Sequence, residues 1–472
     1  MSSKRFQPTY QRSFWETLQL RRIGIRVGIP LLLIGWIALA AFLVGKEKYL
    51  YAAALAGLPF FLLAIEFALS HNHLYPIFIL VSALFIPLSF NTGRSSRLVL
   101  SLVMAIGLVF LWFFQMLMEH RLRLRSTPVN TPAILFSIST VFSLLWGIAF
   151  RDPRVFAWGS FSLTQVASTF VIVMSMGVVL LTGNLITKKN LMQWMVGLFL
   201  IGGVFGLVAN FAKIKLPVNT GGLFAMWCVA LALALAFFNE KLSLWMRGML
   251  ILLAGLWLYW GYGVNISWLA GWVPLIAVFL MVGFFRSPKL AVVMVVLIIV
   301  MVALSWTYFS NSIAIEDKVS GTTRLAAWLQ NWKITKDHLL FGTGPAGYAV
   351  YYMTYFPNQA MATHNNFLDM LSQTGIVGLV LLLWYFGAIL WMGWRLLRRL
   401  RGRRDFMEAL AAACLAGTLG GILMMFFGDW LFPFAYTQSI AGFDYAVYNW
   451  LFMGLILAMD RMTAALPAEA KP

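Results

Sequence analysis

The stretch LAVVMVVLIIVMVALSWTYF, residues 290–309, contains no charged side chain. A helix of about 20 apolar residues crosses the hydrocarbon core of a bilayer, and a helix is required because lipid cannot satisfy exposed backbone N–H and C=O groups. This stretch therefore predicts a transmembrane helix. Further apolar runs of similar length predict spans at 27–44, 51–70, 74–90, 98–118, 131–150, 162–182, 191–211, 222–238, 248–264, 267–285, 375–394, 409–427 and 445–459.

The composition excludes a water-soluble globule and a disordered chain. Hydrophobic residues make up 61% of the sequence and charged residues only 11%, whereas about a quarter of an ordinary soluble domain is charged. The net charge of +19 would suggest nucleic acid in a soluble protein. Here the basic residues lie mostly between the apolar runs, where they orient spans. We therefore expect membrane lipids as partners and no nucleic acid.

The predicted fold class is an all-α integral membrane protein, a polytopic bundle of about 14 transmembrane helices with one long, partly helical extracytoplasmic loop. Residues 1–309 would form an N-terminal membrane domain with about 11 spans, and residues 367–472 a C-terminal membrane segment with about three. The loop, residues 310–366, would carry part of the site. Most Lys and Arg residues fall on one side when both termini are placed in the cytoplasm, so the loop is expected to face outward.

The loop contains one predicted helix and one glycine-rich turn. Thr322 or Thr323 can cap a helix that runs to about residue 338. Its apolar residues recur at helical spacing and predict a helix lying on the membrane surface; they are Leu325, Trp328, Leu329 and Trp332. The turn FGTGPAG, residues 341–347, would end the helix, and its backbone N–H groups could approach a ligand.

His364 stands at the entry to the span that follows the loop, in the sequence THNNFLD. A helix entry offers unpaired N–H groups and favours phosphate, and a neutral imidazole can take a proton from a sugar hydroxyl. The alternative is that His364 only caps the helix. Asp369 lies five residues on and would reach His364 only if the helix entry bends.

These motifs together resemble the bacterial O-antigen ligase and O-antigen polymerase superfamily. The resemblance is carried by SGTTR with Trp328, HLLFGTG at 338–344, HNNFL at 364–368 and GIVGL at 375–379, in this order. It implies a GT-C-type glycosyltransferase of the bacterial cytoplasmic (inner) membrane, inverting, and without a metal or other cofactor. Its donor would be an undecaprenyl-pyrophosphate-linked glycan and its acceptor another glycan or lipid A–core, at the outer face of the membrane.

The resemblance also implies roles for particular residues. The family's histidine corresponds to His364, with Asn365 beside it as a substrate contact, and the family's loop arginine corresponds to Arg324. A second arginine, expected to bind pyrophosphate, is replaced here by Asn265. Another cation would have to serve, and fixed cations can stabilise a pyrophosphate leaving group. The cations considered for this role are Arg151, Arg154, Lys213 and Lys215.

Three other functions remain open at this point. A polymerase would use a second lipid-linked repeat unit as acceptor in place of lipid A–core. A lipid-linked glycan flippase or other transporter would need several polar residues at mid-membrane depth, and Glu66 is the one acidic residue deep in a predicted span. A structural membrane protein with a decayed site is the third reading, and it rests on Asn265.

Overall fold

The computed structural model describes most of the chain beyond residue 64. The described residues are 65–91, 97–120, 124–153, 155–157, 159, 161–265, 269–316, 322–355, 362–436 and 439–464, with the single positions 36, 39, 42, 46 and 48. The chain divides into two units, Met1–His71 and Asn72–Pro472. The expected span 27–44 and most of 51–70 lie outside the described residues. In the first unit, residues 65–70 are helical and Glu66 is exposed.

Among the described residues of the second unit, regular structure is helical apart from one short strand pair. Eight helical segments among the described residues are long and apolar enough to cross a membrane, namely Leu100–Met118, Asn130–Ala149, Phe161–Leu185, Lys189–Ala212, Leu244–Val264, Asn366–Leu400, Phe406–Met424 and Ile440–Ala464. The helices are α4 (Tyr75–Phe85), α5 (Leu100–Met118), α6 (Asn130–Ala149), α7 (Phe161–Leu185), α8 (Lys189–Ala212), α9 (Phe224–Phe238), α10 (Leu244–Leu258), α11 (Leu269–Arg286), α12 (Pro288–Leu304), α13 (Trp306–Glu316), α14 (Thr322–Thr335), α15 (Gly347–Tyr355), α16 (Asn366–Leu400), α17 (Phe406–Met424) and α18 (Phe443–Ala464).

An all-helical membrane bundle is confirmed, whereas the count of 14 spans is not. The expected span 74–90 ends early: α4 stops at Phe85, before Pro87, which cannot continue a helix. Residues beyond it form β1 (Ser89–Asn91), antiparallel to β2 (Arg97–Val99). The expected span 290–309 is divided between α12 and α13 at Ser305, whose hydroxyl donates to the carbonyl of Met301. Such bonding to the preceding turn bends helices.

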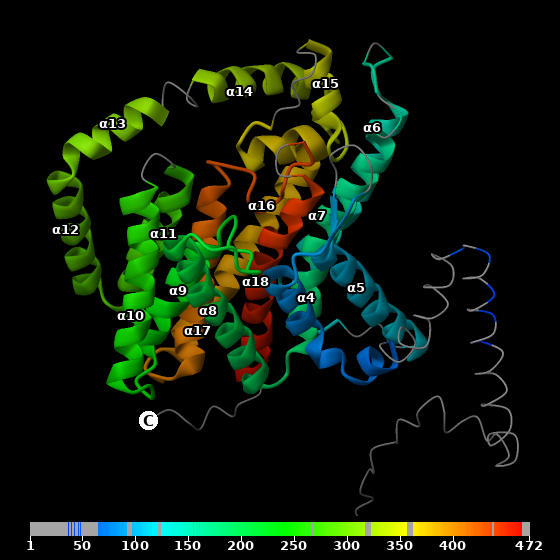
Figure 1. Cartoon of the computed structure of the whole chain (residues 1–472). Helices are drawn as coiled ribbons and strands as arrows, with labels where there is room; N and C mark the ends of the chain where they lie inside the picture. The colour runs from blue at the N-terminus through cyan, green and yellow to red at the C-terminus, as the bar shows by residue number, and fades with distance from the viewer. Residues whose placement is uncertain are drawn as a thin grey trace, which may run out of the picture. The chain divides into compact units, whose positions relative to one another are not determined.

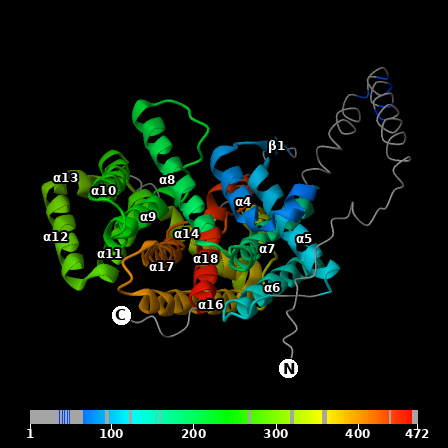
Figure 2. The ribbon, with the colours of Figure 1, turned by 90° about the horizontal axis from the view of Figure 1, so that it is seen from below.

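The core of the second unit is built around α18. In Figure 2, α18 lies between α7 and α17, with α16 and α9 beside them. The contact between α7 and α18 is close because a glycine stands on each helix. A Cβ at Gly454 would lie 2.6 Å from the Cβ of Thr182, and one at Gly183 would lie 2.7 Å from the Cβ of Leu457. Small residues that let backbones approach are typical of helix packing in membranes.

The glycine turn after α14 packs into a kink in α16. Gly375 has φ +69°, which interrupts the helix, and the N–H groups of the next two residues donate to the carbonyls of Leu339 and Leu340. In return, the N–H groups of Thr343 and Gly344 donate to carbonyls of α16. The expectation that the turn's N–H groups approach a ligand is therefore wrong for these two amides, because both already donate hydrogen bonds to α16.

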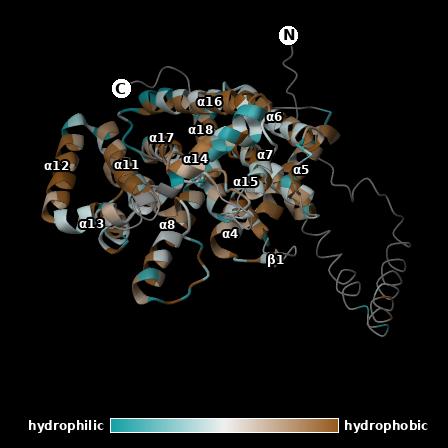
Figure 3. Ribbon diagram, turned by 90° about the horizontal axis from the view of Figure 1, so that it is seen from above, coloured by the Kyte–Doolittle hydropathy of each residue, from teal (hydrophilic) through white to brown (hydrophobic). Residues whose placement is uncertain are grey.

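The α14 helix lies with α13 and α15 at one end of the bundle, at the top of Figure 1, here called the α14 end. The predicted helix 322–338 is confirmed as α14 followed by the short 3-10 helix Lys336–His338. Of the predicted apolar stripe, Leu325, Leu329 and Trp332 are exposed, whereas Trp328 is half-buried. The opposite face of α14 packs on the protein. Figure 3 shows α11 and α12 as mostly apolar ribbons.

Candidate active site

His364 occupies a tight turn directly before α16, at the α14 end. Its backbone is left-handed, with φ +51°. The next residue, Asn365, is the N-cap of α16, and its Oδ1 accepts hydrogen bonds from the N–H groups of Phe367 (3.0 Å) and Leu368 (3.3 Å). Asparagine is among the best N-caps because its side chain satisfies these orphan donors. The cap therefore starts the helix one residue after His364 and leaves the imidazole outside the helix.

Asp369 fixes the shape of this turn. Its buried Oδ1 accepts from the N–H of Thr363 (3.1 Å) and from the Thr363 hydroxyl (2.7 Å). The sequence left open whether Asp369 would reach His364 through a bend at the helix entry. In the structure its hydrogen bonds go to Thr363, so Asp369 holds the backbone next to His364.

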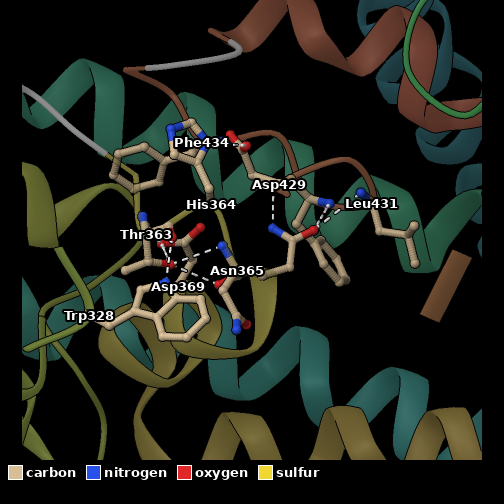
Figure 4. Close-up of polar contacts among 10 residues, drawn as sticks. Trp328, Thr363, His364, Asn365, Asp369, Asp429, Leu431 and Phe434 are labelled. Carbon is tan, nitrogen blue, oxygen red and sulfur yellow. Dashed lines mark hydrogen bonds and ion pairs between the residues drawn. The ribbon is translucent and has the colours of Figure 1, made fainter. Parts of the chain in front are cut away.

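The carboxylate that faces His364 comes from Asp429, a residue that sequence reasoning missed. The Nδ1 of His364 lies 3.7 Å from the Oδ1 of Asp429 (Figure 4), and the side chain of Asp429 is only 1% exposed while that of His364 is 34% exposed. Its one sequence signal was an acidic residue in the otherwise apolar run FFGDWLFPF at 426–434. A buried carboxylate beside an imidazole stabilises the imidazolium that forms when the ring takes a proton.

Asn366 holds the Asp429 segment in place. Its Oδ1 accepts from the N–H groups of Leu431 and Phe432, both at 3.2 Å, and its Nδ2 donates to the carbonyl of Phe432 at 2.9 Å. The motif HNN therefore has three structural tasks. His364 faces the carboxylate, Asn365 starts α16, and Asn366 anchors the segment that brings the carboxylate.

The loop helix α14 contacts the same turn. The Nε1 of Trp328 donates to the carbonyl of Thr363 at 2.7 Å. Arg324, which is half-buried, precedes Trp328 by four residues and so lies on the same face of α14. The structure thus brings the Arg324 side of α14 toward the turn that carries His364.

Arg151 lies in a different part of the α14 end. Arg151 lines a cavity of about 750 Å³ together with Lys333, Asp337 and His338. Its Nη2 donates to the Oε1 of Gln165 at 3.1 Å, and its guanidinium lies 4.9 Å from the centre of the Phe161 ring. Arg154 lies outside the described residues.

Two groups in this cavity are shifted in pKa by burial. Burial lowers the pKa of His338, although the nearby carboxylates of Asp337 and Asp152 act against the shift. Burial raises the pKa of Tyr351, whose hydroxyl oxygen accepts a hydrogen bond from the N–H of Asp152 at 3.1 Å. At neutral pH the imidazole is therefore mostly uncharged and the phenol keeps its proton.

Asn265, where the resemblance leads us to expect an arginine, lines a separate cavity of about 200 Å³ with Asn210, Gly221 and Gly222. Its Nδ2 donates to the carbonyl of Trp260. Lys213 follows Asn210 by about one helical turn, and both Lys213 and Lys215 are exposed.

This smaller cavity is separated from the Asp429 segment by Tyr445. A Cβ at Gly222 would lie 2.9 Å from the ring of Tyr445. That ring in turn has its centre 6.4 Å from the ring of Trp430, the neighbour of Asp429. Among the described residues, no group of three or more His, Cys, Asp or Glu side chains could hold a metal ion.

Comparison with known proteins agrees with the motifs. Residues 249–383 match the family model described as O-antigen ligase. No curated protein matches the chain. The matched segment runs from α10 into α16 and includes α14, the glycine turn and His364. It confirms the resemblance seen in the sequence and supports an assignment to the O-antigen ligase and polymerase family.

Proposed function

We propose, from the O-antigen ligase match of residues 249–383, that the chain is a membrane glycosyltransferase of the bacterial cytoplasmic membrane. It would transfer a glycan from an undecaprenyl-pyrophosphate donor to an acceptor glycan or lipid A–core. The observation that carries the proposal is the pairing of His364 with the buried Asp429 at the entry of α16. In this proposal the α14 end faces the exterior and both termini lie in the cytoplasm.

His364 acts as the general base in a single inverting displacement. The acceptor hydroxyl oxygen forms a bond to the donor's anomeric carbon while the bond from that carbon to the pyrophosphate oxygen breaks. The hydroxyl proton passes to the free ring nitrogen, Nε2, and the leaving electron pair stays on the carrier pyrophosphate. Asp429 holds the ring through Nδ1 and stabilises the positive charge that it gains.

The leaving pyrophosphate needs cations. Arg324 is proposed as one, because it lies on the face of α14 that Trp328 attaches to the His364 turn. Lys213 and Lys215 are proposed as the others, because they come shortly after Asn210, which lines the cavity of Asn265 and Gly222. The ring of Tyr445 lies between this cavity and the Asp429 segment. The two lysines would replace the arginine that is absent at Asn265.

Asn365 is proposed to contact the substrate only through its Nδ2, since its Oδ1 caps α16. The exposed apolar side chains of α14 would lie against the membrane surface, so that α14 covers the site and excludes water, which otherwise competes as acceptor.

The test is a reaction with purified components. The full-length protein in lipid nanodiscs is offered one undecaprenyl-pyrophosphate-linked glycan, with either lipid A–core or a second lipid-linked repeat unit as acceptor, and the products are sized. A product on lipid A–core identifies a ligase, and a longer lipid-linked glycan identifies the alternative, a polymerase. Movement of the lipid-linked glycan across the membrane, without a new glycosidic bond, would contradict the proposal and favour a flippase.

A further inference from the structure

The cavity that Arg151 lines is the larger of the two polar cavities described above, and nothing in the proposed displacement uses it. It is formed where the end of α6 meets the C-terminal part of α14 and α15, and its volume is about 750 Å³. That volume lies in the range of small-molecule sites, which are typically clefts of a few hundred to about 1,000 Å³. The cavity is therefore large enough for a ligand.

Among the described residues that line this cavity, the charges are balanced. Arg151 and Lys333 bring two positive charges, and Asp152 and Asp337 bring two negative ones. His338 adds none at neutral pH because burial lowers its pKa. A pyrophosphate here would meet two carboxylates as well as two cations. This balance argues against the role in pyrophosphate binding that the sequence suggested for Arg151.

A balanced set of donors and acceptors suits a polyhydroxyl ligand instead. Carboxylates accept hydrogen bonds from hydroxyl groups, and guanidinium and ammonium groups donate to hydroxyl oxygens. The Tyr351 hydroxyl receives the N–H of Asp152, so its own proton remains to be donated. The exposed ring of Phe150 supplies an apolar surface beside these groups. A sugar ring presents hydroxyl groups at its rim and C–H groups on its faces, which match both features.

The Arg151 side of the cavity is preorganised. The guanidinium is held by the hydrogen bond to Gln165 and by the ring of Phe161. The rings of His338 and Tyr351 meet edge to face, with their centres 4.8 Å apart. A site whose groups are already fixed loses less conformational entropy when its ligand binds.

The helix α14 relates this cavity to His364. Trp328 binds the His364 turn, and Asp337 lines the cavity nine residues further along the same helical segment. At 1.5 Å per residue these two points are about 14 Å apart along the axis. A ligand in the cavity is therefore displaced along α14 from the His364 turn, and it can belong to the same extended glycan as the reacting hydroxyl.

We propose that the cavity of Arg151, Lys333 and Asp337 binds a saccharide unit of the acceptor glycan, remote from the reacting hydroxyl. The identification of this saccharide as part of the acceptor rests on the proposed function. The binding of a saccharide can be measured without any transfer.

The first experiment measures binding. The probes are the deacylated core oligosaccharide of lipid A–core and the free repeat-unit oligosaccharide, observed by saturation-transfer NMR with the full-length His364→Asn protein in nanodiscs. Lys333→Gln and Asp337→Asn are expected to weaken binding of one probe about tenfold, the usual effect of losing a hydrogen bond to a charged group. Lys336→Gln is the control, because Lys336 is exposed and does not line the cavity. Equal affinity in all these proteins, or no binding of either probe, would overturn the inference.

The second experiment measures transfer by the protein with His364 intact. The same substitutions at Lys333 and Asp337 should raise the KM for acceptor about tenfold and leave the KM for donor unchanged. A raised donor KM would assign the cavity to the pyrophosphate carrier and would overturn the inference. If the wild-type protein binds a probe through Lys333 but transfers nothing, the proposed reaction fails and the saccharide site stands. If it transfers glycan with an acceptor KM insensitive to both substitutions, the reaction stands and the saccharide site fails.

Discussion

Asn366 and Phe432 are joined through both the N–H and the carbonyl of Phe432, although 66 residues separate them in the chain. This double contact fixes the segment that carries Asp429 against the first turn of α16. The distance between His364 and Asp429 therefore depends on a side chain that acts through its hydrogen bonds to the backbone of residues 431 and 432.

Replacing Asn366 by Ala should destabilise the protein and abolish transfer. The change leaves three buried backbone groups of residues 431 and 432 without their partner, and each unsatisfied buried group costs about 1–3 kcal/mol. A clear fall in the midpoint of thermal unfolding, followed by tryptophan fluorescence in nanodiscs, is the expected result. An unchanged midpoint would show that the Asp429 segment is held by other contacts.

Asp429→Asn should lower kcat while the protein keeps its fold. The amide resembles the carboxylate in shape but carries no charge to stabilise the imidazolium, and general acid–base catalysis contributes roughly 10²–10⁴-fold. We expect a loss of at least about tenfold in kcat, with the KM for donor unchanged. The check is steady-state kinetics on protein whose unfolding midpoint matches the wild type. Wild-type kcat in Asp429→Asn would remove Asp429 from the mechanism.

Gly375→Ala tests the kink in α16. A Cβ there would lie 2.2 Å from the carbonyl oxygen of Leu340, and φ is +69°, where alanine is strained. Transfer and thermal stability should both fall. Gly387 is the matched control in the same helix, because nothing lies within 4 Å of a Cβ at that position. Gly387→Ala should be neutral or slightly stabilising, by at most about 1 kcal/mol. Equal behaviour of the two variants would contradict the docking of the glycine turn.

Trp328→Phe tests the link between α14 and the His364 turn. The phenyl ring keeps much of the apolar contact, but the hydrogen bond to the Thr363 carbonyl is lost, which costs about 1 kcal/mol. We expect a lower kcat and faster proteolysis within α14. Trp332→Phe on the exposed face serves as control and should leave both unchanged. Similar effects of the two substitutions would mean that α14 does not act through Thr363.

The sequence predicted those helices that can be recognised from the pattern of neighbouring residues alone. Apolar length identified the long spans, and the helical spacing of the apolar residues from Leu325 to Trp332 identified α14. Three of these four residues are exposed, and the fourth, Trp328, is half-buried. Span counting was less successful where a helix is short or broken, as at Ser305 and Pro87, because apolar composition does not report a bend.

The site was only partly predictable for a related reason. His364 stands in a recognisable motif, whereas Asp429 reaches it through contacts between distant segments, and no local pattern encodes them. For Arg151, the residue type and its position at a span end suggested a pyrophosphate contact, and that role stays a prediction. The carboxylate of Asp337, which balances it, comes from another part of the chain.

The most direct test of the central claim compares two histidines. His364→Asn removes the base and keeps a residue that tolerates left-handed backbone, and His120→Asn makes the same change at an exposed position with φ +48°. Glycan transfer from the undecaprenyl-pyrophosphate donor should fall by at least about 100-fold in His364→Asn and stay at the wild-type rate in His120→Asn. Wild-type transfer by His364→Asn would contradict the account.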